Sequence, residues 1–320
     1  MLEPATIQSV RFSGHESFPL RFSWLAKAVR ACSETHQQDV FVRDDAVVML
    51  GVGKNMVRSM RHWALRSGMI QPADDSKRGG RYEPTDLGWY LFGHDGVDPY
   101  LEDPATTWLV HWGLCSNPEV SPTTWYFLLS LLREQSFTIH ESVEALLRFA
   151  EPAGGKPANR NTVERDVHCF VRTYSRYEPD RKISREEAFD SPLSELNLIR
   201  QAHESDRILI ERSERPTLPP AVFAFALLDF WNRQGTEGHT LSFEQVAYGP
   251  GGPGQVFKLS ENAVVDLLDR LPDATRGAVA FDSTAGLRQV LKHKRLPQGL
   301  AVLTQHYGAH AAMEVRSDAE

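Results

Sequence analysis

Residues 44–82 constrain the fold most strongly, because signals for a helix, a tight turn and a second helix follow one another there. Aspartates that can cap a helix precede an apolar run, Gly51 and Gly53 allow a tight turn, and a longer periodic segment extends to Gly68. A polar loop rich in Lys, Arg and Gly comes next and ends at Tyr82. This order predicts a winged helix-turn-helix, a module whose second helix enters a DNA major groove while its wing contacts the backbone.

The second helix of this module is expected to have an apolar face and a basic face. Because successive side chains turn by about 100° in an α-helix, its apolar side chains gather on one arc and most of its basic ones on the opposite arc. Asn55, Arg58 and His62 are expected to reach base edges, whereas the wing would contact phosphates. The residues predicted to bind DNA in this module are Lys54, Asn55, Arg58, Arg61, His62, Arg66, Lys77, Arg78 and Arg81.

The local charge favours the same interpretation. Residues 51–82 contain seven Lys or Arg and two Asp, a balance of +5 in a chain whose net charge is −7. The negative net charge of the whole chain argues against a histone-like polyelectrolyte. A nucleic-acid site must therefore be local, and its affinity must fall steeply with salt. A solvated helix face beside an ordinary hairpin, or a winged helix that docks a protein, would have a similar pattern, and both alternatives stay open.

Length and composition indicate several globular modules. With 320 residues, of which 41% are hydrophobic, the chain can bury two or three cores. The three cysteines are widely separated and lack the Cys-x-x-Cys spacing of zinc sites, so buried thiols are expected. No apolar run reaches the roughly 18 residues of a membrane span, and the N-terminus lacks a signal-peptide core. We expect a cytoplasmic protein.

The predicted fold is mainly α with small β-wings. We expect a winged helix-turn-helix at residues 1–95, a helical middle module at 96–215, a winged-helix-like α+β module at 216–307 and a tail at 308–320. In the middle module, a turn precedes the amphipathic segment 162–174, which could be a second helix-turn-helix with Arg160 and Arg165 on DNA. In the last module, helix signals end with a final helix from Thr284.

Two groups of polar residues could support catalysis, and each also has a structural explanation. His15 and Glu16 could serve as acid–base partners or metal ligands, but adjacent residues in a loop usually point apart. Asp98, Glu102 and Asp103 offer the hard oxygen ligands that Mg²⁺ or Mn²⁺ prefers, although Asp103 can also cap a helix that begins with proline. The chain lacks a convincing Asp…Glu-x-Lys or His-Asn-His nuclease motif, so the motifs do not identify the chemistry.

The glycine-rich segment 248–260 invites a phosphate-binding interpretation. It lacks a Gly-Lys-Ser/Thr ending, and its prolines remove backbone donors that a phosphate cradle would use. We therefore predict a structural turn, followed by a strand.

Several stretches together resemble the SspB-like family of bacterial single-strand DNA phosphorothioation systems, formerly a domain-of-unknown-function family. These are Gly-His-Glu-Ser-Phe at 14–18 with Trp-Leu-Ala-Lys at 24–27, residues 98–104 with 108–112, and segments 162–174, 218–231 and 248–259. The resemblance covers roughly residues 11–295. It implies a DNA-nicking role in anti-phage defence, with a cysteine desulfurase, a sulfur transferase and an ATPase as partners. It assigns no catalytic residue.

Two functions follow from these observations. The first is a DNA nickase or nicking subunit, which would cut DNA with a metal-bound water near Asp98, Glu102 and Asp103 or with His15 and Glu16 as acid–base partners. The second is a noncatalytic DNA-binding adaptor or regulator that recruits the sulfur-transfer enzymes. A requirement for Mg²⁺ or Mn²⁺ in DNA cutting would separate them.

Overall fold

The computed structural model describes residues 10–34, 39–73, 81–151, 157–176, 191–201, 205–235, 239–293, 297 and 299–317. Contacts within the chain divide it into two compact units, Ala5–Glu211 and Arg212–Glu320. This boundary lies close to the one expected after residue 215, while a further boundary near residue 95 stays a prediction. The described elements are mainly helices, with small antiparallel sheets, as expected.

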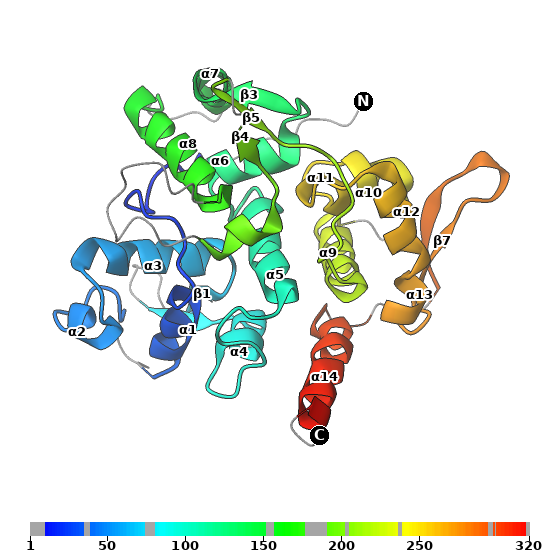
Figure 1. The fold of residues 1–320 in the computed structure, drawn as a ribbon, viewed down its shortest axis with the longest axis horizontal. Coiled ribbons are helices and arrows are strands. Elements are labelled where there is room, and N and C mark those ends of the chain that lie inside the picture. Colours follow the sequence, from blue (N-terminus) through cyan, green and yellow to red (C-terminus); the bar gives the residue numbers. More distant parts are fainter. Residues whose placement is uncertain are drawn as a thin grey trace. The chain divides into compact units, whose positions relative to one another are not determined.

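The first unit opens with three helices, a short hairpin and a fourth helix. They are α1 (Trp24–Glu34), α2 (Ala46–Leu50), α3 (Lys54–Arg66), β1 (Ile70–Pro72), β2 (Tyr82–Pro84) and α4 (Asp86–Phe92). Gly51 ends α2 with a φ of 64°, so this turn favours glycine, whereas Gly53 has an ordinary extended backbone. Helix, turn, helix and hairpin therefore follow in the expected order (Figure 1).

The apolar faces of α1 and α3 form the core of this part. Trp24 and Leu25 of α1 and Met60 and Trp63 of α3 are almost fully buried. Burying a side chain of this size stabilises the fold by about 1.5–3 kcal/mol relative to leaving it exposed. The indole N–H of Trp63 donates to the carbonyl of Phe18 at 3.0 Å, so its polar atom is satisfied. The apolar arc predicted for the second helix is confirmed as its packing face.

The rest of the first unit is built on a buried helix and a small sheet. The elements are α5 (Pro104–Cys115), α6 (Thr123–Tyr126), the π-helical turn η1 (Phe127–Leu131), β3 (Ser136–Thr138), α7 (Ile139–Ala150), α8 (Arg160–Tyr174), the 3₁₀ turn η3 (Pro192–Leu196), β4 (Arg200–Gln201) and β5 (Arg207–Leu209). β5 pairs antiparallel with both β3 and β4. Val163 and Val167 of α8 pack against Val143 and Leu146 of α7, which confirms the predicted apolar stripe.

The second unit repeats the strand order of that sheet. Its elements are α9 (Pro220–Arg233), β6 (Thr240–Ser242), α10 (Phe243–Tyr248), α11 (Pro253–Val256), α12 (Glu261–Asp269), α13 (Leu271–Ala274), β7 (Val279–Asp282), η4 (Thr284–Gly286), β8 (Gln289–Lys292) and α14 (Gly299–Ser317). In the order β6-β8-β7, as in β3-β5-β4, the strand before the helices pairs with the last strand. None of the helices in the described residues is long and apolar enough to cross a membrane.

Two predicted elements of the second unit are wrong. Thr284 starts only a 3₁₀ turn, because the following residues form β8 between β6 and β7. The strand expected directly after the glycines is instead the end of α11 and a turn, because α11 already begins at Pro253. Its apolar residues are buried, and a short buried run has the same pattern in a helix as in a strand. Residues expected to form a tail from 308 continue α14 as far as Ser317.

The glycine-rich segment is a buried structural turn, as predicted. The Arg212 guanidinium donates to the carbonyls of Ala247, Gly254 and Leu259 at 3.2, 3.2 and 2.9 Å. A Cβ at Gly254 would lie 2.6 Å from the Cα of Ala247, so the backbone approaches too closely for a side chain. These carbonyls hold an arginine, not a phosphate.

Candidate nucleic-acid interface

The outer face of α3 is the most basic exposed helix surface of the first unit's N-terminal part. Lys54, Asn55 and Arg58 are exposed, and α3 contains no carboxylate. No side chain caps its first turn, so backbone N–H groups there can meet an anion. A hollow of about 630 Å³ lies at this end of the helix, lined in part by Arg21 and Lys54. The arrangement suits a phosphate group.

Two further basic residues of α3 also serve the fold. The guanidinium of Arg61 lies 3.7 Å from the carboxylate of the buried Asp39. Burial raises the pKa of Asp39, although the Phe41 amide and Arg61 act against that rise. Arg66 donates to the carbonyl of Val120 at 3.1 Å, and burial lowers its pKa. Both side chains are only half-buried, and their contact with DNA stays a prediction.

His62 lies inside the protein, so the exposure expected for it is wrong. His62 is only 9% exposed, and its ring packs edge to face against the Trp63 ring, with 5.4 Å between the ring centroids. A loop packs over this side of α3, since a Cβ at Gly14 would lie 2.6 Å from His62 Nδ1. Burial lowers the pKa of His62 well below its ordinary value, and the nearby His15, Arg66 and Arg61 act in the same direction.

The structure tests little of the predicted wing contact. Lys77 and Arg78 lie outside the described residues. Arg81 is half-buried directly before β2, and its carbonyl accepts a hydrogen bond from the Ala73 amide at 3.1 Å. The hairpin that would carry the wing is therefore present, while its phosphate contacts stay a prediction.

The loop formed by residues 13–18 is anchored on Asp166 of α8. One oxygen of this buried carboxylate is 2.7 Å from His15 Nε2 and accepts the Ser13 amide at 2.7 Å. The other accepts the Thr124 hydroxyl at 3.0 Å. Three donors therefore satisfy a carboxylate that is 1% exposed, which is the condition for burying such a charge.

The same loop is bonded to α3 on its other side. The Ser59 hydroxyl donates to the carbonyl of His15 at 2.9 Å, and Trp63 binds the carbonyl of Phe18. The Ser17 amide donates to His15 Nδ1 at 2.9 Å. Burial lowers the pKa of His15, but Asp166 and Cys169 outweigh this effect and raise the pKa to about 10. The Ser17 amide, which donates to Nδ1, favours the neutral ring. In Figure 1 the segment before α1 runs between α3 and α8.

The backbone of this loop is strained. Left-handed φ angles occur at Ser13 (67°), Gly14 (96°), Glu16 (47°) and Ser17 (62°). For residues other than glycine this conformation costs roughly 1–2 kcal/mol each. The hydrogen bonds to both helices hold the strain in place, and strain of this kind is concentrated at functional sites in proteins.

His15 and Glu16 have separate partners in the structure. His15 is 2% exposed and bound to Asp166, whereas Glu16 is exposed, with its carboxylate 3.8 Å from the guanidinium of Arg58. The two side chains therefore point apart, as expected for adjacent residues in a loop. A catalytic role for either residue stays a prediction.

The acidic group before α5 is used for capping. Asp98 accepts the amides of Glu102 and Asp103 at 2.9 and 3.1 Å, and Asp103 caps α5 through the Ala105 amide at 2.8 Å. Only Glu102 leaves its carboxylate exposed. Within the described ranges, no group of three or more His, Cys, Asp or Glu side chains is arranged to hold a metal ion. The capping explanation is confirmed, and metal binding by these residues stays a prediction.

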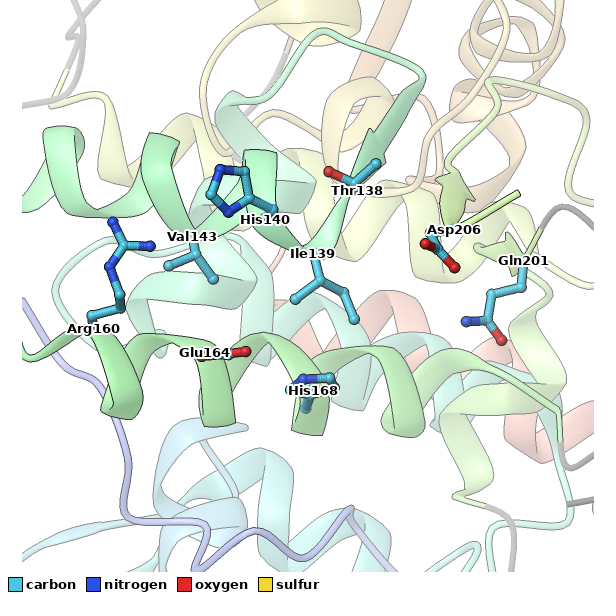
Figure 2. Close-up of a pocket in the computed structure, with 9 residues that line it drawn as sticks. All are labelled: Thr138, Ile139, His140, Val143, Arg160, Glu164, His168, Gln201 and Asp206. Atoms are coloured by element: carbon cyan, nitrogen blue, oxygen red, sulfur yellow. The ribbon is translucent and has the colours of Figure 1, made fainter.

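α8 exposes a second basic row beside a pocket. Figure 2 shows this pocket, of about 490 Å³, between the start of α7 and the outer side of α8. Its polar lining residues are Thr138, His140, Arg160, Glu164, His168, Gln201 and Asp206. Arg160 is paired there with Glu144, whereas Arg165 is exposed, and its Nε donates to the Asn161 carbonyl of the same helix at 3.2 Å. Of the two predicted contacts on α8, Arg165 is better placed for an external phosphate.

The sequence interpretation did not identify Asp166 or Thr124. One signal was present, because Asp166 is a charged residue beside Val163 and Val167 on the buried side of an amphipathic helix. Such a residue needs a buried partner, but the chain offers many candidates. Nothing local indicates that the partner is His15, 151 residues away.

Comparison with known proteins gives a family and a fold. A family model described as a protein of unknown function (DUF4007) matches residues 12–307. A magnesium ion-bound SspB crystal structure is 27% identical with a TM-score of 0.84, covering 96% of this chain and 91% of that one. A second SspB crystal structure is 27% identical with a TM-score of 0.83, covering 95% and 91%. No curated protein matches significantly.

These matches confirm the resemblance found in the sequence. The family model extends over most of the chain, and the SspB structures agree with its fold over nearly the same length. The chain belongs to the DUF4007 family and is SspB-like.

Proposed function

We propose that this protein binds duplex DNA through the outer face of α3 as part of a DNA phosphorothioation system. The observation that carries the proposal is an exposed helix face with Lys54, Asn55 and Arg58 and no carboxylate. The order of helix, turn, helix and hairpin supports a winged helix, in which this helix would read the major groove. The likeness to SspB supports the choice of system.

Within that system, the activity we propose is DNA nicking, either alone or as a nicking subunit. The alternative is a noncatalytic adaptor that brings the cysteine desulfurase, sulfur transferase and ATPase to DNA. Both functions use the α3 face in the same way. They differ in whether the chain itself cuts the phosphodiester backbone.

A requirement for Mg²⁺ or Mn²⁺ belongs to the nickase proposal. One similar structure is described as magnesium ion-bound, which supports a divalent ion in this family. The acidic group before α5 fits such an ion poorly, because Asp98 and Asp103 already accept backbone amides. We therefore assign no ligands to the ion.

Conversion of supercoiled plasmid to open circle tests the proposal. Purified protein would be incubated with Mg²⁺, Mn²⁺ or EDTA, beside the variant Lys54→Gln/Arg58→Gln. Metal-dependent open circles that disappear in the variant would support a nickase that uses α3. Binding without cutting under every condition would favour the adaptor. Absence of binding at low salt would reject a DNA function.

One further variant tests the acidic group without disturbing the caps. Glu102→Gln removes an exposed carboxylate and keeps the bonds of Asp98 and Asp103. If this group holds the catalytic metal, cutting should fall while binding and thermal stability stay unchanged. Unchanged cutting would exclude Glu102 from the metal site.

A further inference from the structure

The loop of residues 13–18 joins the exposed faces of α3 and α8. Arg58 of α3 faces the Glu16 carboxylate, and Arg172 of α8 donates to the carbonyl of Ser17. Both arginines are exposed, and the loop residues that they contact are consecutive in the chain. The basic faces of the two helices therefore meet at this loop, within one compact unit.

The outer row of α8 has the chemistry of a phosphate-contacting surface. Its members are Asn161, Arg165, His168 and Arg172, all exposed and spaced so that they share one side of the helix. Glu164 lies at the edge of this row, toward the pocket in Figure 2. Arginine and asparagine side chains of this kind supply many of the backbone contacts in protein–DNA complexes.

Buried and partly buried hydrogen bonds set the relative position of the two faces. Asp166 of α8 holds Ser13 and His15, while Ser59 and Trp63 of α3 hold the carbonyls of His15 and Phe18. Buried hydrogen bonds of this type define one geometry more strictly than apolar contacts do. The loop thus acts as a rigid spacer between two basic helix faces.

We infer that α3, the 13–18 loop and α8 form one composite surface that holds a single DNA duplex. This inference rests on the proposed function, and it extends DNA contact from α3 to Arg165 and Arg172 across the loop. The phosphates that it binds lie on both sides of Glu16. The carboxylate of Glu16 competes with them for Arg58.

The salt dependence of binding tests the contribution of α8. Affinity for a duplex of about two helical turns (~21 bp) would be measured by fluorescence anisotropy across a salt series. Each lost phosphate contact reduces the steepness of the fall of log K with log salt by about 0.9, so Arg165→Gln/Arg172→Gln should reduce the steepness by about 1.8. The single variant Arg165→Gln, which keeps the Arg172 bond to the loop, should lower it by about 0.9.

Controls separate this inference from the proposed function. Arg148→Gln removes an exposed arginine from α7 and should leave the slope unchanged. If the wild type binds and Lys54→Gln/Arg58→Gln weakens it, but both α8 variants match the wild type, the composite surface is rejected and the α3 site stands. If the wild type does not bind at low salt, the proposed function fails first. Thermal unfolding of each variant shows whether the fold is intact.

A gain of affinity gives a second test. Glu16→Gln removes the competing carboxylate and should strengthen duplex binding by about twofold to fivefold, the range of an exposed ion pair. Glu134→Gln changes the net charge equally at an exposed position outside the composite surface, and it should have no such effect. Unchanged or weaker binding by Glu16→Gln would contradict the inference. A merely structural role for the loop predicts no gain.

Discussion

α3 and α12 have similar places in their units and opposite charges. Each is the last helix of two turns or more before an antiparallel strand pair, β1–β2 after α3 and β7–β8 after α12, with the four-residue α13 between α12 and β7. α3 carries Lys54, Arg58, Arg61 and Arg66 with no carboxylate, whereas α12 carries Glu261, Asp266 and Asp269 with no base. Both bury an apolar stripe. The buried apolar stripe therefore stabilises the helix in each unit, whereas the charge of its exposed face decides whether that helix can bind DNA.

The two helices also differ in how their titratable groups are placed. α3 holds His62 inside the protein, against His15 and Trp63. The charged groups of α12 lie at the surface, where Glu261 pairs with Arg288 at 3.6 Å and accepts the Tyr248 hydroxyl. Changes of pH should therefore act on the fold around α3 more than on that around α12.

The largest expected effect comes from reversing the charge of α3. Lys54→Glu/Arg58→Glu should weaken duplex binding on the order of 100-fold at roughly 0.1 M salt, because two attractive contacts become repulsive. Fluorescence anisotropy measures the change, and Arg270→Glu/Arg276→Glu, which reverses two exposed arginines of the second unit, is the charge-matched control. Equal losses in the two variants would show that general charge, not the α3 face, governs binding.

A smaller effect concerns pH and stability. As the pH falls below about 6.5 the unfolded chain protonates His62, whereas burial keeps it neutral in the folded chain. The free energy of unfolding should therefore fall by up to about 1.4 kcal/mol per pH unit from this residue. Chemical denaturation between about pH 7 and pH 5 should show a shallower dependence for His62→Leu than for the wild type. Parallel curves would refute the buried, neutral histidine.

The smallest effect should come from giving α12 the charge of α3. Asp266→Lys/Asp269→Lys creates a basic outer face on a helix that keeps its apolar stripe. We expect an increase of a few-fold in nonspecific DNA affinity at low salt, lost as salt rises. Plasmid mobility shifts would detect it. An increase as large as the loss on α3 would mean that the loop and α8 add nothing to the α3 site.

Local patterns were enough for most of the helices. The stripe of α8 and the cap at Asp103 each depend on neighbours within a few residues, and both predictions hold. The two wrong elements are segments whose structure depends on more than their neighbours in the sequence. β8 forms because it pairs with strands far away in the chain, and α11 is a buried run whose pattern does not distinguish helix from strand.

In the candidate site, too, some features follow from the local sequence and others from the folded chain. The basic charge of α3 is visible in its own residues, because an exposed face needs no distant partner. The burial of His62 and the pairing of His15 with Asp166 required the folded chain, since a loop 44 residues before Ser59 packs against α3 and binds a helix 151 residues further on. Periodicity shows which sides of a helix are apolar or polar, but not which polar side another segment will cover.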